Sequence, residues 1–165
     1  MKHFPATIDS PRVYLRLLTS RDAAEFYALT NDPKIADIIS FLSYPVPRKF
    51  ADEWIAKNLG TADRIYGAYA TNNRLVGTIG AHETESGIEI GYWVGSAYMG
   101  QGYATEMAKA LIKMIGEYSP QAEVFAECLP DNAGSWRVLE KVGFVSTGKD
   151  GAKPGRVHLA LKKAA

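Results

Sequence analysis

The sequence predicts an α/β domain with a mixed, mostly antiparallel sheet of about seven strands flanked by about four helices. Three observations support this: strand-like segments separated by polar turns in the middle of the chain, a strongly amphipathic helix directly after them, and alternating strand-like and helix-like segments toward the C-terminus. With 165 residues, 47% of them hydrophobic and 22% charged, the chain has the size of one domain, expected over residues 1–165.

The first third of the chain predicts one strand and two helices. Residues 13–18 are rich in strand formers and precede hydroxyl side chains that can cap a helix over residues 21–32. Two prolines then interrupt the chain before residues 49–59, where apolar side chains recur near helical spacing. A second helix is expected there.

The middle of the chain predicts three antiparallel strands and the strongest helix. The strands are expected at residues 65–71, 74–83 and 87–95, because the short segments between them carry polar and glycine turn residues. Residues 105–118 follow, with apolar side chains along one stripe and charged side chains elsewhere. This pattern is typical of a helix that covers a sheet.

The C-terminal part adds a strand, a short helix and two closing strands. Residues 123–129 have strand character, and residues 130–144 predict a helix that ends at Gly143 in a left-handed cap. The closing strands are expected at residues 144–148 and 156–163.

Charge and composition argue against several classes of partner. The 19 Lys and Arg residues nearly balance the 18 Asp and Glu residues, so we expect no nucleic-acid partner. No apolar run has the length of a signal peptide or a membrane helix, so we expect a cytoplasmic protein without a membrane partner. The single cysteine, Cys128, excludes an internal disulfide and a thiolate metal site, and we interpret it as a small core residue.

A glycine turn opens the strongest helix. Gly100 and Gly102 stand just before it, where free backbone N–H groups carry a partial positive charge and can hold an anion such as a diphosphate. The same turn can also be a tight connection without a ligand. A dinucleotide-binding fingerprint would need a third glycine, where the sequence has Thr105, and a Walker A loop would need a lysine that is missing.

Three segments together, GIEIGYWV, YMGQGYATE and DNAGSWRVLEKVGF, resemble the GNAT superfamily of acetyl-CoA-dependent N-acetyltransferases. They look most like the branch that holds the RimJ/RimL-like ribosomal-protein N-terminal acetyltransferases. The resemblance implies a single GNAT-like domain with acetyl-CoA as co-substrate and its diphosphate on backbone amides of a six-residue turn. That turn falls on Met99, Gly100, Gln101, Gly102, Tyr103 and Ala104, and Thr105 follows it. Its first position carries methionine in place of the Arg or Gln of the family pattern.

The resemblance also implies where the pantetheine arm lies. The strand that carries Trp93 and Val94 should bend away from its neighbour, so that its edge can pair with the arm as an added strand would. The Asn132 side chain should hydrogen-bond the arm, although it can equally serve as a helix cap in competition with Asp131.

The implied reaction is direct attack of a primary amine on the thioester in a ternary complex, with a protein or peptide N-terminus or a small-molecule amine as acceptor. Ser135 is the candidate to contact the cofactor and donate to its sulfur, or else a helix-surface hydroxyl. Glu89 is the candidate base, or else an exposed edge-strand charge, with His82 or a water as substitutes. A non-catalytic acyl-CoA sensor is the alternative function. The sequence leaves monomer or homodimer undecided.

Overall fold

The computed structural model describes residues 4–39, 41–59 and 61–162, and one eight-stranded sheet runs through them. The strand order is β1-β2-β3-β4-β5-β6-β8-β7. Neighbouring strands pair antiparallel except β5 and β6, which are parallel. The strands are β1 (Thr7–Asp9), β2 (Val13–Leu17), β3 (Arg64–Ala70), β4 (Leu75–Thr84), β5 (Gly87–Val94), β6 (Val124–Cys128), β7 (Phe144–Asp150) and β8 (Val157–Leu161).

Five helices and two short 3-10 turns complete the described part of the chain, and the predicted fold class is confirmed. They are η1 (Ser20–Asp22), α1 (Ala23–Thr30), α2 (Pro33–Ala36), α3 (Phe50–Asn58), η2 (Ser96–Tyr98), α4 (Tyr103–Tyr118) and α5 (Ala133–Lys141). Sequence reasoning missed β1 and α2, which are too short to show a hydrophobic period. Gly143 has the expected left-handed conformation, with φ of 101°. The last predicted strand ended at Lys163, which lies outside the described residues.

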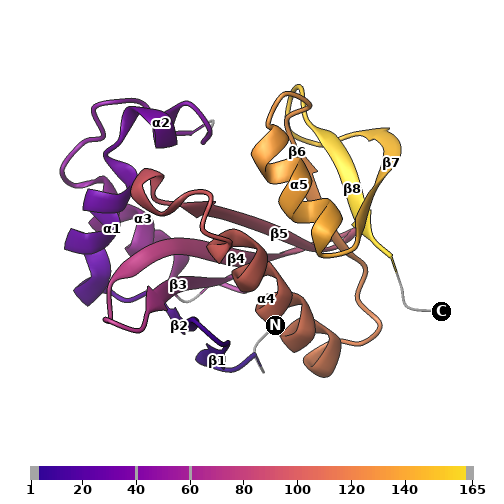
Figure 1. Cartoon of the computed structure of the whole chain (residues 1–165), viewed down its shortest axis with the longest axis horizontal. Coiled ribbons are helices and arrows are strands. Elements are labelled where there is room, and N and C mark those ends of the chain that lie inside the picture. The colour runs from indigo at the N-terminus through magenta and orange to yellow at the C-terminus, as the bar shows by residue number, and fades with distance from the viewer. Residues whose placement is uncertain (1–3, 40, 60, 163–165) are drawn as a thin grey trace.

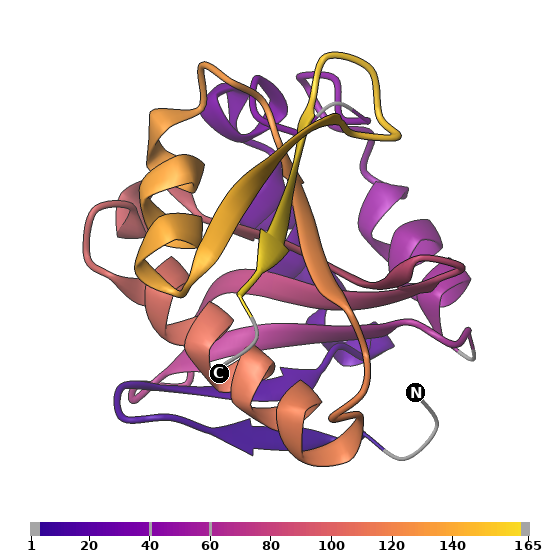
Figure 2. The ribbon, with the colours of Figure 1, turned by 90° about the vertical axis from the view of Figure 1, so that its right-hand side faces the viewer.

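Helices cover both faces of the sheet. On one face, Met107, Leu111 and Ile115 of α4 are buried in a core that also takes side chains from α5 and the central strands. On the other face, Phe26 of α1 and Ile55 of α3 belong to a second buried cluster. Figure 1 shows α4 in front of the central strands and α1 and α3 at one end of the sheet, and Figure 2 brings β6, α5, β7 and β8 toward the viewer.

A buried carboxylate joins the start of α1 to the sheet. Asp22 accepts hydrogen bonds from Arg16 at 2.7 and 3.1 Å, from the Tyr69 hydroxyl at 2.7 Å and from the Thr19 N–H at 2.7 Å. Burial by itself would raise the pKa of this carboxyl group, but the hydrogen bonds outweigh it and lower the pKa to about 2.

We expect Asp22→Asn to lower the free energy of unfolding at pH 7 by about 2 kcal/mol. The unfolded pKa of an aspartate is about 3.9. Because the folded pKa lies below it, the stabilisation is present above about pH 4 and is lost as the pH falls toward 2. Urea unfolding of the wild type and the variant measures this effect from about pH 2 to about pH 7, a range that includes the folded and unfolded pKa values of the carboxyl group. The exposed Asp52→Asn is the control, and an equal loss in both variants would contradict the account.

Candidate active site

Strands β5 and β6 part after a short paired stretch. They pair at Ile88 with Val124 and at Glu89 with Phe125, and the Ile88 N–H donates to the carbonyl of Glu123 at 2.8 Å. Main-chain groups alternate between the two edges of a strand. The main chains of the next even-numbered residues of β5 therefore face the space that β6 leaves. These residues are Ile90, Tyr92 and Val94.

The same alternation separates the roles of the two residues predicted on this strand. Val94 presents its main chain to the open edge. Trp93, one residue earlier and opposite Thr78, turns its main chain toward β4, so it can contribute only its side chain to a ligand.

A cavity of about 470 Å³ lies where the strands part, and its lining joins β4, β5, β6, α5 and the link between β7 and β8. Its walls include most of the catalytic and arm-binding residues named from the sequence. These are Glu89, Trp93, Asn132 and Ser135, with the alternative base His82 and with Cys128, which is 2% exposed as expected of a core residue. Phe41 and Trp54 close the side formed by the α1–α3 region.

Tyr92 meets Ser135 inside this cavity. The Ser135 hydroxyl donates to the Tyr92 hydroxyl oxygen at 3.2 Å, and the Tyr92 hydroxyl donates to the Ser135 carbonyl at 3.3 Å. Burial, only partly offset by the hydrogen bond from Ser135, raises the pKa of Tyr92 to about 12. Sequence reasoning singled out the serine and missed the tyrosine, because nothing local relates two residues 43 positions apart.

Asn132 caps α5. Its Oδ1 accepts the backbone N–H of Ser135 at 3.0 Å, so the helix-cap alternative holds and Asp131 does not take this position. An amide side chain keeps two N–H donors when its oxygen is engaged. Asn132 lines the cavity, so the same residue can cap the helix and donate to a ligand.

The glycine turn before α4 holds two residues in the left-handed conformation. Gly100 and Gly102 have φ of 75° and 84°, and Gly102 is the N-cap of α4. A Cβ added at Gly100 would meet nothing within 4 Å, so the space above it is open. Met99 is 41% exposed, and the Gln101 side chain turns back to the carbonyl of Ala97 at 3.1 Å. Main-chain groups are therefore what this turn presents.

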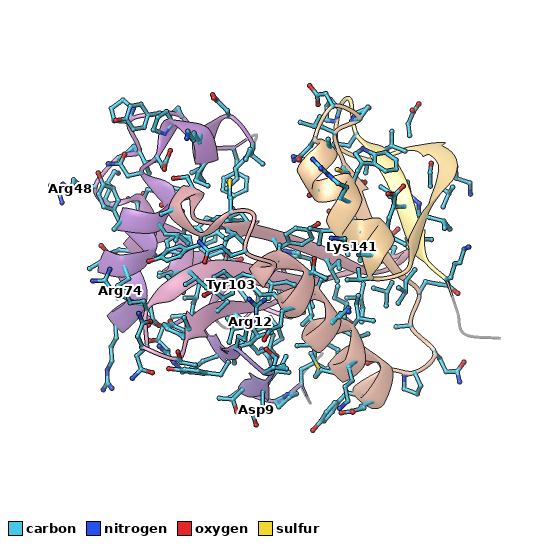
Figure 3. The ribbon with its side chains drawn as sticks, viewed as in Figure 1. Asp9, Arg12, Arg48, Arg74, Tyr103 and Lys141 are labelled. Atoms are coloured by element: carbon cyan, nitrogen blue, oxygen red, sulfur yellow. The ribbon has the colours of Figure 1, made fainter. Side chains whose placement is uncertain are left out.

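A brace from the N-terminal hairpin fixes that turn. The Arg12 Nη1 donates to the carbonyl of Gln101 at 3.0 Å, and its Nε donates to Glu106 in the first turn of α4 at 2.8 Å. The guanidinium lies over the Tyr103 ring at 5.1 Å, and Figure 3 shows the two side chains together. Glu106 also accepts from the Arg12 N–H at 2.6 Å and from Ser10 at 2.7 Å. No local pattern predicts this brace, because Arg12 and Glu106 are 94 residues apart.

We expect Glu106→Gln to lower the free energy of unfolding by about 2 kcal/mol and to weaken binding at the glycine turn about tenfold. Burial would raise the pKa of Glu106, but hydrogen bonds from Arg12, Ser10 and Val13 hold it below its usual range, which shows how strongly the carboxylate is held. Urea unfolding and calorimetric titration with coenzyme A measure the two effects. Glu117→Gln, at the exposed end of α4, is the control, and an intact affinity in Glu106→Gln would contradict the brace.

Glu89 is not on a sheet edge. It lies on β5 between β4 and β6, its side chain is 17% exposed, and its Oε1 forms an ion pair with Lys153. The Lys153 Nζ also lies 3.7 Å from Glu127 Oε2. The substitute base His82 pairs through Nδ1 with Asp63 at 2.9 Å. Both candidate bases line the cavity, and each already has a polar partner, Lys153 for Glu89 and Asp63 for His82.

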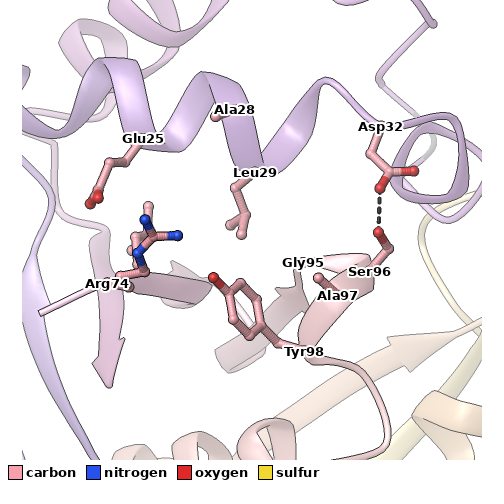
Figure 4. Close-up of a pocket in the computed structure, with 10 residues that line it drawn as sticks. Glu25, Ala28, Leu29, Asp32, Arg74, Gly95, Ser96, Ala97 and Tyr98 are labelled. Atoms are coloured by element: carbon pink, nitrogen blue, oxygen red, sulfur yellow. Dashed lines mark hydrogen bonds between the residues drawn. The ribbon is translucent and has the colours of Figure 1, made fainter. Parts of the chain in front are cut away.

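A second hollow, of about 240 Å³, lies between α1 and η2 (Figure 4). Arg74 and Tyr98 face it, and the Ser96 hydroxyl donates to Asp32 at one side. Among the described residues that line it there is none of the site residues expected from the sequence. We therefore place the candidate site in the larger cavity.

Comparison with known proteins identifies the type of domain. The model of the acetyltransferase (GNAT) domain matches residues 12–145. An uncharacterized N-acetyltransferase of Bacillus subtilis, YnaD, is 26% identical over 141 residues, which cover 83% of this chain and 81% of the relative.

Solved structures agree in fold. A GNAT-family acetyltransferase from Bacillus anthracis superposes with a TM-score of 0.83 at 25% identity, over 94% of this chain and 97% of that one. RimL, a ribosomal L7/L12 α-N-protein acetyltransferase solved with coenzyme A, has a TM-score of 0.81 at 17% identity, over 95% of each chain. Within the described residues, no helix has both the length and the apolar character needed to span a bilayer.

Proposed function

The chain belongs to the GNAT acetyltransferase family, and from this premise we propose that it transfers an acetyl group from acetyl-CoA to a primary amine by direct attack in a ternary complex. We extend the proposal to the whole chain, residues 1–165, as one such domain working in the cytoplasm. The observation that carries it is the continuity of the open edge of β5 with the cavity that holds Tyr92 and Ser135.

The glycine turn and the open strand edge offer the two kinds of contact that coenzyme A needs. The diphosphate would rest on the amides of residues 100–104 at the start of α4. The amide-bearing arm would pair with the main chains of Tyr92 and Val94, as an added strand pairs with a sheet edge. The Asn132 side-chain amide would donate to the arm from α5. RimL and the MccE acetyltransferase, solved with coenzyme A and acetyl-CoA respectively, share this fold.

Arg12 supplies a positive charge beside the turn. The motif position that carries Arg or Gln in the resemblance holds Met99 here, which brings no charge. The Arg12 guanidinium bonds to Gln101 inside the turn and would approach a bound diphosphate from the hairpin side. We propose that this distant residue replaces the missing side chain.

Different side chains in the cavity would deprotonate the acceptor amine and protonate the leaving sulfur. Glu89, His82 or a water held by them would take a proton from the acceptor ammonium, and the neutral amine would then attack the thioester carbonyl. Tyr92, neutral over the working pH range because its pKa is raised, would give its proton to the sulfur as the carbon–sulfur bond breaks. Ser135 would orient Tyr92 through their hydrogen bond and contact the cofactor.

The acceptor is a primary amine on a protein or peptide N-terminus or on a small molecule. An α-amino group has an ordinary pKa of about 7.7 to 8.0 and a lysine side chain about 10.4, so a weak base suffices for the former. Phe41 and Trp54 offer apolar contact to whatever carries the amine.

Thermal unfolding with and without acetyl-CoA, followed by a free-thiol assay with N-terminal peptides and a panel of small amines, tests the proposal. We expect stabilisation by the cofactor and thiol release that depends on the amine. Stabilisation without release for any amine would favour a non-catalytic acyl-CoA sensor. No stabilisation at saturating acetyl-CoA would overturn the proposal.

A further inference from the structure

The Lys153 amine occupies the place where an acceptor amine would meet its base. Its Nζ contacts Glu89 Oε1, the candidate base, and lies 3.7 Å from Glu127 Oε2. Lys153, Glu89, Tyr92 and Ser135 all line the same cavity of about 470 Å³. The chain thus places one of its own primary amines beside the group proposed to deprotonate an acceptor, in the cavity that also holds the group proposed to protonate the leaving sulfur.

The link between β7 and β8 holds Lys153 there. Glu127 of β6 accepts the backbone N–H groups of Ala152 at 2.5 Å and of Lys153 at 3.0 Å, and Arg156 donates to the Glu127 carbonyl at 3.2 Å. The Glu127 side chain is 2% exposed, so this anchor is well shielded from water. The Lys153 side chain is 47% exposed, and it can therefore change rotamer on a backbone that stays fixed.

The distance to the reacting centre suits such a movement. Glu89 and Tyr92 are three residues apart on β5, which corresponds to about 10 Å along a strand, and their side chains leave opposite faces of it. Both line the cavity, which therefore reaches both faces of β5 where the strand parts from β6. A lysine amine sits on a flexible four-carbon stem, and a bound acyl group would extend toward it along the open edge. A swing of one side chain within the cavity can therefore bring the amine to a thioester near Tyr92.

We propose that Lys153 is an internal acetyl acceptor, so that the protein acetylates itself at this lysine when no other amine is bound. The inference rests on the proposed function, because it uses the same acetyl donor and the same catalytic groups. The link between β7 and β8, which carries Lys153, would then regulate access of other amines to the acceptor side of the cavity.

The reaction balances without a further reactant. Glu89 takes one proton from the Lys153 ammonium, and the neutral amine attacks the thioester carbonyl carbon. The nitrogen loses its second proton as the carbon–sulfur bond breaks, and this proton replaces the one that Tyr92 gives to the thiolate. The products are Nε-acetyl-lysine, the free thiol of coenzyme A and the one proton that Glu89 releases to water. The lysine loses its charge, so its ion pairs with Glu89 and Glu127 are lost. The acceptor side of the cavity would then be open to another amine.

Incubation of the full chain with acetyl-CoA and no amine, followed by peptide mass spectrometry, tests this inference. We expect one acetyl group at Lys153, added at a first-order rate that does not depend on protein concentration. Exposed Lys149 on β7 is the internal reference for spontaneous acetylation, and we expect Lys153 to react at least about 100-fold faster. Lys153→Arg keeps the positive charge and should abolish the modification, Glu89→Gln should slow it about tenfold, and Lys149→Arg should leave it unchanged.

The outcomes separate this inference from the proposed function. Acetylation of Lys153 at the rate of Lys149, or at a rate proportional to protein concentration, would overturn the inference. An unmodified Lys153 in a preparation that releases thiol with external amines would overturn it and leave the proposed function standing. An unmodified Lys153 together with no thiol release and no stabilisation by acetyl-CoA would overturn both.

Discussion

Tyr92→Phe is expected to lower kcat about 100-fold, because a phenol that donates a proton to the leaving sulfur contributes on this scale. The variant keeps the ring that packs against the core and removes only the hydroxyl bonded to Ser135. The Kd for coenzyme A should change little, since the arm is proposed to pair with the Tyr92 main chain. Steady-state thiol release and calorimetric titration measure the two quantities separately.

Ser135→Ala provides the comparison for that result. Ser135 is proposed to orient Tyr92 and contact the cofactor, so its loss should lower kcat less than loss of the proton donor. We expect kcat of Ser135→Ala to fall about tenfold. The pH profile adds a readout that packing would not move. Because the pKa of Tyr92 is raised to about 12, the wild type should show no alkaline loss from this group between pH 7 and about pH 10. A fully active Tyr92→Phe would show that another group protonates the sulfur.

Gly100→Ala is expected to weaken acetyl-CoA binding about 100-fold, since the new methyl group would occupy the open space above the turn and a left-handed residue other than glycine costs about 1 kcal/mol in strain. Gly100 has φ of 75°, and its Cβ would meet no protein atom within 4 Å. The protein should therefore remain folded while the cradle for the diphosphate is filled. Calorimetric titration with coenzyme A measures the affinity.

Gly116→Ala, inside the helix that follows the turn, is the matched control. Gly116 lies within α4, and a Cβ there also meets nothing within 4 Å, but its backbone is not left-handed. This variant should be more stable than the wild type by about 0.5 to 1 kcal/mol and should bind coenzyme A unchanged. Equal affinities of the two variants for coenzyme A would show that the diphosphate does not bind at the glycine turn.

Local patterns account for the parts of the fold that sequence reasoning predicted. The apolar stripe of α4 and the alternating burial at the start of β5 repeat with the period of each element. Strands β3 and β4 are buried over most of their length, and their strand formers between polar turns predict them. Strand β1 and helix α2 have three and four residues, too few for any period. Helix α2 is marked instead by Asp32, whose side chain accepts the N–H of Lys34 at 2.8 Å.

In the candidate site, too, features that depend on adjacent residues could be predicted from the sequence, and features that join distant residues could not. The glycine turn is visible in the sequence because its special conformation depends on adjacent residues. The Arg12–Glu106 brace, the Tyr92–Ser135 pair and the Glu89–Lys153 ion pair each join residues brought together only by the sheet order. Their side chains are ordinary in type, so spacing along the chain carried no signal for them.

Titration of isotope-labelled protein with coenzyme A, followed by amide NMR, tests most directly the claim that the parted edge of β5 and the glycine turn form one cofactor site. We predict that the amide signals of Tyr92, Val94 and residues 100–104 shift together with a single Kd, while those of β1 and α3 stay in place. Shifts confined to the hollow between α1 and η2, or no shifts in residues 100–104 at saturation, would contradict the claim.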